Sequence, residues 1–205
     1  MSQIHLHQHD LPEGLDWGTS IAVDSETMGL EPRRDRLCLV QVSAGDGTAH
    51  LVQFAPGRYE APVLKALLSD ATILKIFHFA RFDIAVFQQY LGVMTAPLYC
   101  TKIASKLVRT FTDRHGLRDL CRDLLDVEIS KQQQSSDWGA DTLTEAQHAY
   151  AASDVLHLHA LKQRLDELLA REGRTALAEA AFQFLPYRAT LDLMGWDNVD
   201  IFAHS

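Results

Sequence analysis

The stretch I-A-V-D-S-E-T (21–27) joins a short apolar run to the acidic pair Asp24 and Glu26. Side chains two positions apart in an extended strand point to the same side of a sheet, so the two carboxylates can share one metal ion. Open α/β sheets carry their functional sites at the ends of strands, and the acidic pair ends this apolar run. The stretch therefore predicts a buried strand with an acidic site at its end.

Chance alone supplies about three acidic pairs of this spacing in a chain with 27 acidic residues among 205. The pair must therefore be considered with two other segments, H-F-A-R-F-D (78–83) and Y-A-A-S-D (150–154). Taken alone, Asp83 is equally well explained as a helix N-terminal residue, and Tyr150 as a core side chain. All three segments fall on sheet-edge or helix-face positions, and such a joint placement rarely arises by chance. They predict one constellation of Asp24, Glu26, Asp83, Tyr150 and Asp154.

Four carboxylates that meet in a fold can hold two divalent cations, and a tyrosine beside them can orient a water molecule. This combination is suited to cutting a phosphodiester bond. Hard oxygen ligands favour Mg²⁺ or Mn²⁺ over zinc. We therefore expect two divalent cations, Mg²⁺ or Mn²⁺, as cofactors.

The order of expected elements predicts an α/β domain. Strands are expected at 4–9, 21–24, 37–43, 49–54, 73–77 and 98–100, and helices at 61–68, 82–91, 101–109 and 117–125. The Asp46-Gly47 turn makes the strands on either side of it an antiparallel hairpin. The later alternation of strands and helices implies a mixed sheet with parallel members, flanked by helices.

The clearest helix is expected to begin near residue 143, because Thr142 and Glu145 have the spacing of a capping box. Three- and four-residue steps then define one face of a long helix. That face carries Tyr150, Asp154, Leu158, Leu161, Leu165 and Leu168. A buried aspartate without a partner is costly, so Asp154 needs a cation, a hydrogen-bond network or a cleft.

Composition favours a single domain over residues 1–205, with 47% hydrophobic and 22% charged residues. No apolar run reaches the ~18–20 residues that span a bilayer, and the histidine-interrupted N-terminus is unlike a signal peptide. Three cysteines without C-x-x-C spacing are typical of a reduced, cytoplasmic chain. The net charge of −8 argues against a broad basic surface for long nucleic acid, so a small or end-bound substrate is expected.

The three motifs resemble those of the DEDD family of 3′–5′ exonucleases, whose ribonuclease H-like (DnaQ-like) fold has a mixed sheet flanked by helices. That family carries D-x-E in its first motif, an Asp near a helix start in its second, and Y-x-x-x-D or H-x-x-x-x-D in its third. Tyr150 lies four residues before Asp154, which matches the tyrosine (DEDDy) branch, whereas Ala149 stands at the histidine position of the other branch. K-Q-Q-Q-S-S-D-W (131–138) resembles the ribonuclease D-like members.

A closer resemblance is to the nanoRNase C group of this family, compact enzymes that degrade diribonucleotides. It rests on R-D-R-L-C (34–38), K-I-F-H-F-A-R-F-D (75–83), C-T-K-I-A-S-K-L (100–107), T-D-R-H-G-L (112–117) and I-F-A-H-S (201–205). The resemblance implies a metal-dependent 3′–5′ exoribonuclease that hydrolyses very short RNA, above all diribonucleotides, to mononucleotides. It also implies a closed homo-oligomer, an octamer.

The resemblance further implies a role for each residue of the constellation. Asp24, Glu26 and Asp154 would hold one metal, and Asp24 with Asp83, directly or through water, would hold the second. The second metal would stabilise the leaving 3′-oxygen, while Tyr150 would orient the attacking water. Because an ordinary tyrosine has a pKa near ~10, orienting the water suits Tyr150 better than acting as a general base.

Candidate substrate contacts lie next to the motifs. The resemblance suggests that Leu30 wedges between two bases, with a core leucine as the alternative. His78, Arg81 and the loop at 131–134 are expected to contact sugar or phosphate, with a solvated surface arginine as the alternative for Arg81. No room is expected after Asp154 for the helical RNA-binding modules of ribonuclease D. The candidate substrate-binding residues are Met28, Leu30, His78, Arg81, Lys131 and Gln134.

The apolar C-terminal segment, about 182–205, either completes the core or packs against another subunit. The resemblance favours the second. Two other functions stay open: a broader 3′–5′ exonuclease acting on longer RNA or DNA, and a noncatalytic nucleic-acid-binding module. Unused clustered carboxylates would repel one another, which disfavours the binding module.

Overall fold

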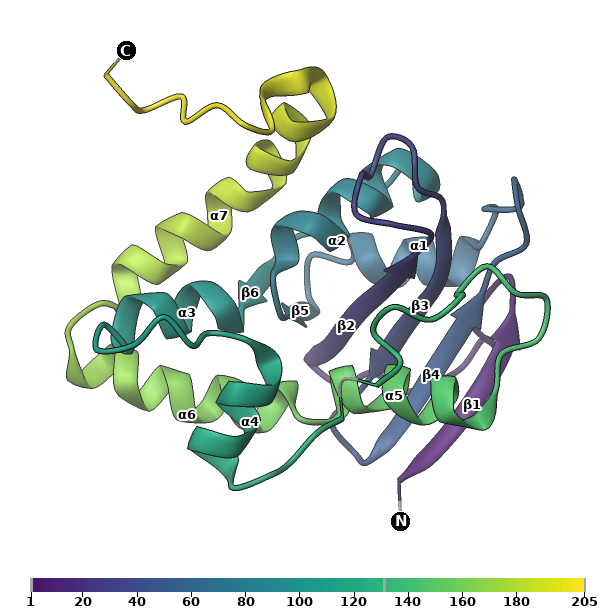
Figure 1. Cartoon of the computed structure of the whole chain (residues 1–205), viewed down its shortest axis with the longest axis horizontal. Helices are drawn as coiled ribbons and strands as arrows, with labels where there is room; N and C mark the ends of the chain where they lie inside the picture. Colours follow the sequence, from purple (N-terminus) through teal and green to yellow (C-terminus); the bar gives the residue numbers. More distant parts are fainter. Residues whose placement is uncertain (1, 131, 205) are drawn as a thin grey trace.

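A six-stranded mixed sheet forms the centre of the chain in a computed structural model that describes residues 2–130 and 132–204 (Figure 1). The strand order is β1-β4-β3-β2-β5-β6. The central neighbours β2, β3 and β4 are antiparallel, whereas β1, β5 and β6 pair in parallel with β4, β2 and β5 respectively. The strands are β1 (Gln3–Gln8), β2 (Ser20–Thr27), β3 (Leu37–Ser43), β4 (Thr48–Gln53), β5 (Leu74–Phe77) and β6 (Leu98–Cys100). The predicted mixed sheet and hairpin are confirmed.

Helices flank both faces of this sheet. Helix α5 lies across β2, β3 and β4, and α1 and α2 lie behind the sheet in the view of Figure 1. The helices are α1 (Pro62–Ser69), α2 (Ala80–Val86), η1 (Phe87–Leu91), α3 (Thr101–Val108), α4 (Leu117–Leu125), α5 (Glu145–Leu156), α6 (Leu158–Arg171), α7 (Thr175–Leu191) and η2 (Asp192–Trp196). In the part of the chain that the structure describes, none of them is long and apolar enough to cross a bilayer.

The buried middle of the sheet places the acidic segment at the edge of the core. All seven residues of β3 are buried, and so are Ile21, Ala22 and Val23 of β2. Burying a side chain the size of Ile21 stabilises the fold by about 1.5–3 kcal/mol, which fixes the register of β2 against its neighbours. Asp24 follows directly after these three residues, so the same packing positions its carboxylate.

The capping box of α5 lies two residues later than predicted. Thr144 accepts a hydrogen bond from the N–H of Gln147 at 3.2 Å, and Gln147 Oε1 accepts one from the N–H of Thr144 at 2.9 Å. The prediction of Thr142 and Glu145 was wrong because T-L-T-E-A-Q (142–147) offers the same spacing twice. Leu143 is buried just before the cap, and a buried apolar residue there fixes where the chain enters the helix.

The predicted long helix is two helices. Helix α5 ends at Leu156, and α6 begins at Leu158 after His157, whose backbone has φ −105° and ψ −7°. Tyr150 and Asp154 therefore belong to α5, while the leucines at 158, 161 and 165 form the buried face of α6. The change of direction lets α5 cover the sheet while α6 packs against α3 and α4.

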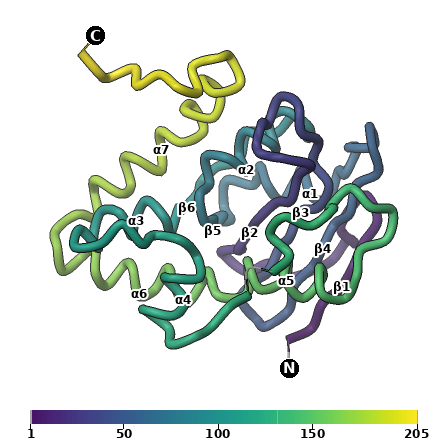
Figure 2. The backbone as a smooth tube through the Cα atoms, in the orientation of Figure 1, coloured from purple at the N-terminus to yellow at the C-terminus, as the bar shows by residue number. Residues whose placement is uncertain are grey.

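The C-terminal segment divides into a packed part and an exposed part. Helix α7 buries Phe182, Leu185 and Ala189 and packs against α2. Beyond it, the chain turns at η2 and ends on the opposite side of the molecule from β1 (Figure 2). Met194 and Phe202 are 64% and 78% exposed there. The first part thus completes the core, whereas most apolar side chains of the second are exposed, with Phe202 contacting Phe184 at a ring-centroid distance of 5.7 Å.

Candidate active site

Three carboxylates from two elements meet at the end of β2. Asp24 and Glu26 project from β2 and Asp154 from α5, and one oxygen atom of each lies within 4.8 Å of the others. Oxygen ligands bind Mg²⁺ or Ca²⁺ at ~2.0–2.6 Å, so three oxygens this close can surround one such cation. We call these three residues the carboxylate trio. The fold brings together three of the four predicted metal ligands in this way.

Asp83 lies beside the trio, in the first turn of α2. Its side chain is buried, and Ser25 Oγ donates a hydrogen bond of 2.6 Å to its Oδ1 atom. Ser25 stands between Asp24 and Glu26 on β2, so the strand that carries the acidic pair also orients the fourth carboxylate. The sequence gives no signal for this role, because a serine gains it only from a partner 58 positions away.

Burial raises the pKa of all four carboxyl groups, and repulsion by neighbouring carboxylates adds to the rise in the pKa of Asp24, Glu26 and Asp83. Burial raises the pKa of Asp24 and of Glu26 well above the ordinary range, and the neighbouring carboxylates raise the pKa of both further. Burial likewise raises the pKa of Asp83 and of Asp154 to about 7. A divalent cation would relieve this repulsion, because an opposite charge favours the ionised form of each carboxyl. This all-oxygen, electrostatically crowded centre fits a hard divalent cation.

Tyr150 precedes Asp154 by one turn of α5. Its ring packs against Trp138 at a centroid distance of 6.0 Å. Burial raises the pKa of Tyr150 above its ordinary value, and the negative charges of Asp154, Glu26 and Asp24 raise that pKa further. The hydroxyl is therefore protonated at neutral pH. Such a group can orient a water molecule through a hydrogen bond but is unsuited to removing its proton.

Two cavities meet at these residues and share Asp24, Gln134, Tyr150 and Asp154. The first, of about 510 Å³, we call the apolar cavity after four of its walls, Met28, Leu30, Phe82 and Trp138; the rest of its lining is largely polar and includes Glu26 of the trio. The second, of about 350 Å³, we call the basic cavity, and its distinguishing walls are His78, Phe79, Lys102 and Arg118. Both volumes are in the range of small-molecule sites.

The structure places the predicted substrate-binding residues in different settings. Met28, Leu30 and Gln134 line the apolar cavity, and His78 lines the basic cavity with Nδ1 2.9 Å from Thr101 Oγ1. Leu30 is 88% exposed, so it is not a core leucine.

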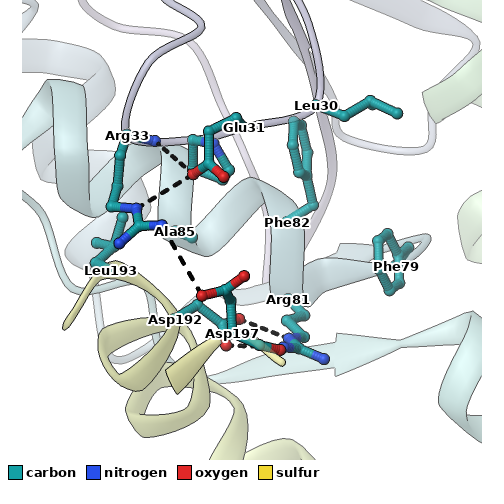
Figure 3. A pocket seen from close by; sticks show the side chains of 11 residues that line it. Leu30, Glu31, Arg33, Phe79, Arg81, Phe82, Ala85, Asp192, Leu193 and Asp197 are labelled. Carbon is teal, nitrogen blue, oxygen red and sulfur yellow. Dashed lines mark hydrogen bonds and ion pairs between the residues drawn. The ribbon is translucent and has the colours of Figure 1, made fainter. Parts of the chain in front are cut away.

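Two of the predicted substrate-binding residues, Arg81 and Lys131, are not among the described walls of either cavity. Arg81 lines neither cavity; its guanidinium pairs with Asp192 at 2.5 Å (Figure 3). Lys131 lies outside the described residues. The substrate-binding roles of both residues, like those of the other four, stay predictions.

Several walls of the two cavities were not singled out from the sequence, among them Phe82, Trp138, Lys102 and Arg118. Lys102 and Arg118 come from the first turns of α3 and α4, and only the packing of these helices brings both to the site. Their spacing along the chain is unremarkable, so no local pattern identifies them.

Comparison with known proteins agrees with this geometry. A sequence profile of the 3′–5′ exonuclease domain family matches residues 8–170. The chain belongs to the 3′–5′ exonuclease family. Ribonuclease D from Gluconacetobacter diazotrophicus is 40% identical over 154 residues, which cover 75% of this chain and 39% of that relative. The chain thus spans about two fifths of the length of the curated relatives it matches.

Solved structures extend the likeness over the whole chain. Brucella melitensis NrnC bound to pGG is 57% identical, with a TM-score of 0.97 and full coverage of both chains. The same protein with bound Mg²⁺ is 56% identical, with a TM-score of 0.95 over 99% of this chain and 100% of that one. The resemblance to this family and the exonuclease fold, both predicted from the sequence, are confirmed.

Proposed function

We propose that the chain is a metal-dependent 3′–5′ exoribonuclease that hydrolyses very short RNA, diribonucleotides above all, to mononucleotides. The observation that carries this proposal is the position of the carboxylate trio where the apolar and basic cavities meet. A dinucleotide has one phosphodiester bond between two nucleosides, so a catalytic centre between two small cavities matches its shape. The likeness to NrnC bound to pGG supports the same class of substrate.

Divalent cations are the proposed cofactors. Asp24, Glu26 and Asp154 would hold one, and Asp83 together with Asp24 would hold the second. When bound, Mg²⁺ or Mn²⁺ lowers the pKa of a coordinated water and offsets charge on the phosphate and leaving oxygens. The crowding of four carboxyl groups with raised pKa values supports this assignment. The Mg²⁺-bound structure of NrnC supports it as well.

The remaining catalytic tasks belong to two hydroxyl groups of the chain. The protonated hydroxyl of Tyr150, held between the Trp138 ring and Asp154, would orient the attacking water. The Ser25 hydroxyl holds Asp83 in a fixed direction through its 2.6 Å hydrogen bond. Neighbours that hold the reacting groups in place lower the activation free energy, because less translational and rotational entropy is lost on the way to the transition state.

The two cavities suit different parts of a nucleotide. A base presents flat apolar faces, which match Leu30, Phe82 and Trp138 in the apolar cavity. A phosphate group requires positive charge, and Lys102 and Arg118 supply it in the basic cavity. These two positively charged side chains lie together at the site, although the chain as a whole has a net charge of −8. Charge concentrated at one small site favours a substrate held by its ends over a long strand.

A length series tests the proposed activity. RNA substrates of two to about seven nucleotides are compared by kcat/KM, which measures specificity, with Mg²⁺ and with Mn²⁺. Cleavage confined to dinucleotides is the expected result. Equal kcat/KM values along the series, or on DNA, would favour the broader 3′–5′ exonuclease, and no cleavage with either metal would favour the noncatalytic binding module.

We further propose that residues 1–205 form one domain that assembles as a homo-oligomer in the cytoplasm, an octamer by resemblance. Exposed apolar side chains after the middle of α7 support an interface between subunits, namely Tyr187, Met194, Trp196, Ile201 and Phe202. Three free cysteines suit a reducing compartment. Light scattering is expected to give eight times the chain mass of 23.0 kDa. A monomeric mass would contradict the assembly.

A further inference from the structure

Asp192 ties the C-terminal turn (residues 192–197) to helix α2. Its Oδ2 and Oδ1 atoms accept hydrogen bonds from Nε and Nη2 of Arg81 at 2.5 and 2.8 Å (Figure 3). Nη2 of Arg81 also donates to the carbonyl oxygen of Asp197 at 2.7 Å. Arg188 of α7 donates to the same Asp192 carboxylate, at 3.0 Å from Nε. One carboxylate, 12% exposed, thus holds two guanidinium groups.

A second tie joins the same turn to the Leu30 loop, which comprises residues 28–36 between β2 and β3. Nη2 of Arg33 lies 3.9 Å from Oδ1 of Asp197, and its Nε lies 3.3 Å from Oε1 of Glu31 within the loop. Figure 3 shows both contacts, with the Leu30 side chain extending away from the ion pairs. The C-terminal turn therefore holds the loop that carries the candidate wedge.

A cavity of about 180 Å³ separates these ties from the candidate active site. The Leu30 loop, α2 and the C-terminal turn all contribute to its walls. Leu30 and Phe82 line it on one side and line the apolar cavity on the other. The space equals roughly six water molecules at ~30 Å³ each, so solid packing does not back Leu30 on this side, whereas Phe82 packs against the hydrophobic core. The position of Leu30 therefore depends on its loop and on the ion pairs that contact that loop.

We infer that Asp192 is a positioning residue for the substrate site, acting through Arg81 and through the Leu30 loop. The inference rests on the proposed function. It also gives Arg81 a role beside the predicted substrate contact: Nε and Nη2 of Arg81 pair with Asp192 and Asp197, so this side chain holds α2 in place. Without the Asp192 carboxylate, the guanidinium groups of Arg81 and Arg188 face each other as like charges and repel. The C-terminal turn, α2 and the Leu30 loop then move apart.

Steady-state kinetics of D192N on pGG with Mn²⁺ test the inference. KM is expected to rise about tenfold with kcat within threefold of the unaltered protein, because the loss falls on binding and not on the chemical step. The matched control is E167Q, which removes an exposed ion pair of 2.7 Å with Arg164 on α6. Its KM should be unchanged. A D192N protein with unaltered KM, or with a loss confined to kcat, would overturn the inference.

A double-mutant cycle separates positioning from a general loss of stability. If Asp192 acts through the Leu30 loop, the double variant D192N/L30A should have the same KM as whichever single variant has the higher KM. Both substitutions would then remove the same interaction, the contact of the Leu30 side chain with substrate. KM increases that multiply would overturn the inference. Should D192N not fold, R33A removes the contact with Asp197 together with the contact to Glu31 within the loop, and it is expected to raise KM about threefold; no increase would overturn the inference. Failure of the unaltered protein to cleave pGG refutes the proposed function instead, so the two failures are distinguishable.

Discussion

The carboxylate trio and the walls of the two cavities are built in different ways. Asp24, Glu26 and Asp154 stand on a strand and a helix whose neighbours are buried. The walls include a loop residue, Leu30, that is 88% exposed, and cationic side chains from helix starts. Regular elements fix positions within narrow limits, whereas exposed loops vary and move. Under the proposed function, the trio would therefore determine the reaction and the walls would determine the substrate.

The largest expected loss of activity follows the removal of one carboxylate of the trio, which tests directly whether the trio is needed for the reaction. Asp154→Asn should lower kcat/KM on pGG by about a thousandfold or more, because metal ions contribute several kcal/mol of charge stabilisation. Calorimetry with Mn²⁺ should show weakened binding in the same variant. Activity within tenfold of the unaltered protein would show that the trio is not the metal site.

The next effect concerns the residue that orients water. Tyr150→Phe keeps the ring that packs on Trp138 and removes only the hydroxyl. Positioning of a proton-transfer partner is worth about 10²-fold or more, so kcat should fall by that factor. Mn²⁺ affinity and thermal stability should match the unaltered protein. Near-normal turnover would contradict the role of the hydroxyl.

A substitution in the basic cavity should act on binding alone. Lys102→Ala removes a cation from its wall, and KM for pGG should rise about tenfold with little change in kcat. Lys106→Ala is the matched control, since Lys106 is exposed one turn later on α3. If both variants behave alike, or if Lys102→Ala lowers kcat and leaves KM unchanged, the division between reaction and substrate binding fails.

The Ser25 hydroxyl, which orients Asp83, lies beside the trio without belonging to it. Its removal tests how far the reaction depends on residues that support the carboxylates. Ser25→Ala deletes a buried hydrogen bond of 2.6 Å worth about 1 kcal/mol, so kcat should fall roughly fivefold. The loss should be partly offset by raising the Mn²⁺ concentration, because a misdirected Asp83 weakens one cation site. A kcat equal to that of the unaltered protein at all Mn²⁺ concentrations would show that Asp83 needs no orientation.

The smallest expected effect is on stability and follows from the raised pKa values. Folding raises the pKa of Asp83 and of Asp154 to about 7, so the protonated carboxyls favour the folded state at low pH. That contribution is lost as the pH rises from the pKa of the unfolded state, about 4, to the folded pKa of about 7, at about 1.4 kcal/mol per pH unit for each proton released. In EDTA, the Tm should fall by roughly 2–4 °C or more between pH 6 and pH 8. Excess Mg²⁺ should reduce the fall, and a metal-free Tm that rises with pH would contradict the description of the centre.

The same contrast explains what the sequence could predict. Asp24 and Glu26 follow from the two-residue period of a strand, and Tyr150 and Asp154 from the four-residue step of a helix. These periods are local, so the proposed metal ligands on β2 and α5 could be predicted from the sequence. The capping box was misplaced because two overlapping patterns compete within 142–147, and the burial of Leu143 decides between them.

The supporting residues could not be predicted because their partners are distant in the sequence. Ser25 gains its role from Asp83, and Arg81 is paired with Asp192, 111 positions away. Lys102 and Arg118 become neighbours of the trio only when α3 and α4 pack. Motif and family resemblance predicted the fold and the proposed reaction; the contacts around the two cavities could be seen only from three-dimensional packing.

The most direct test is a crystal structure of the protein with pGG and Ca²⁺, a cation that occupies oxygen sites of this kind. The account predicts that the phosphodiester lies at Asp24, Glu26 and Asp154, with one base against Leu30 in the apolar cavity. It also predicts a phosphate within hydrogen-bond distance of Lys102 or Arg118 in the basic cavity. A dinucleotide bound away from the trio, or one that leaves either cavity empty, would contradict it.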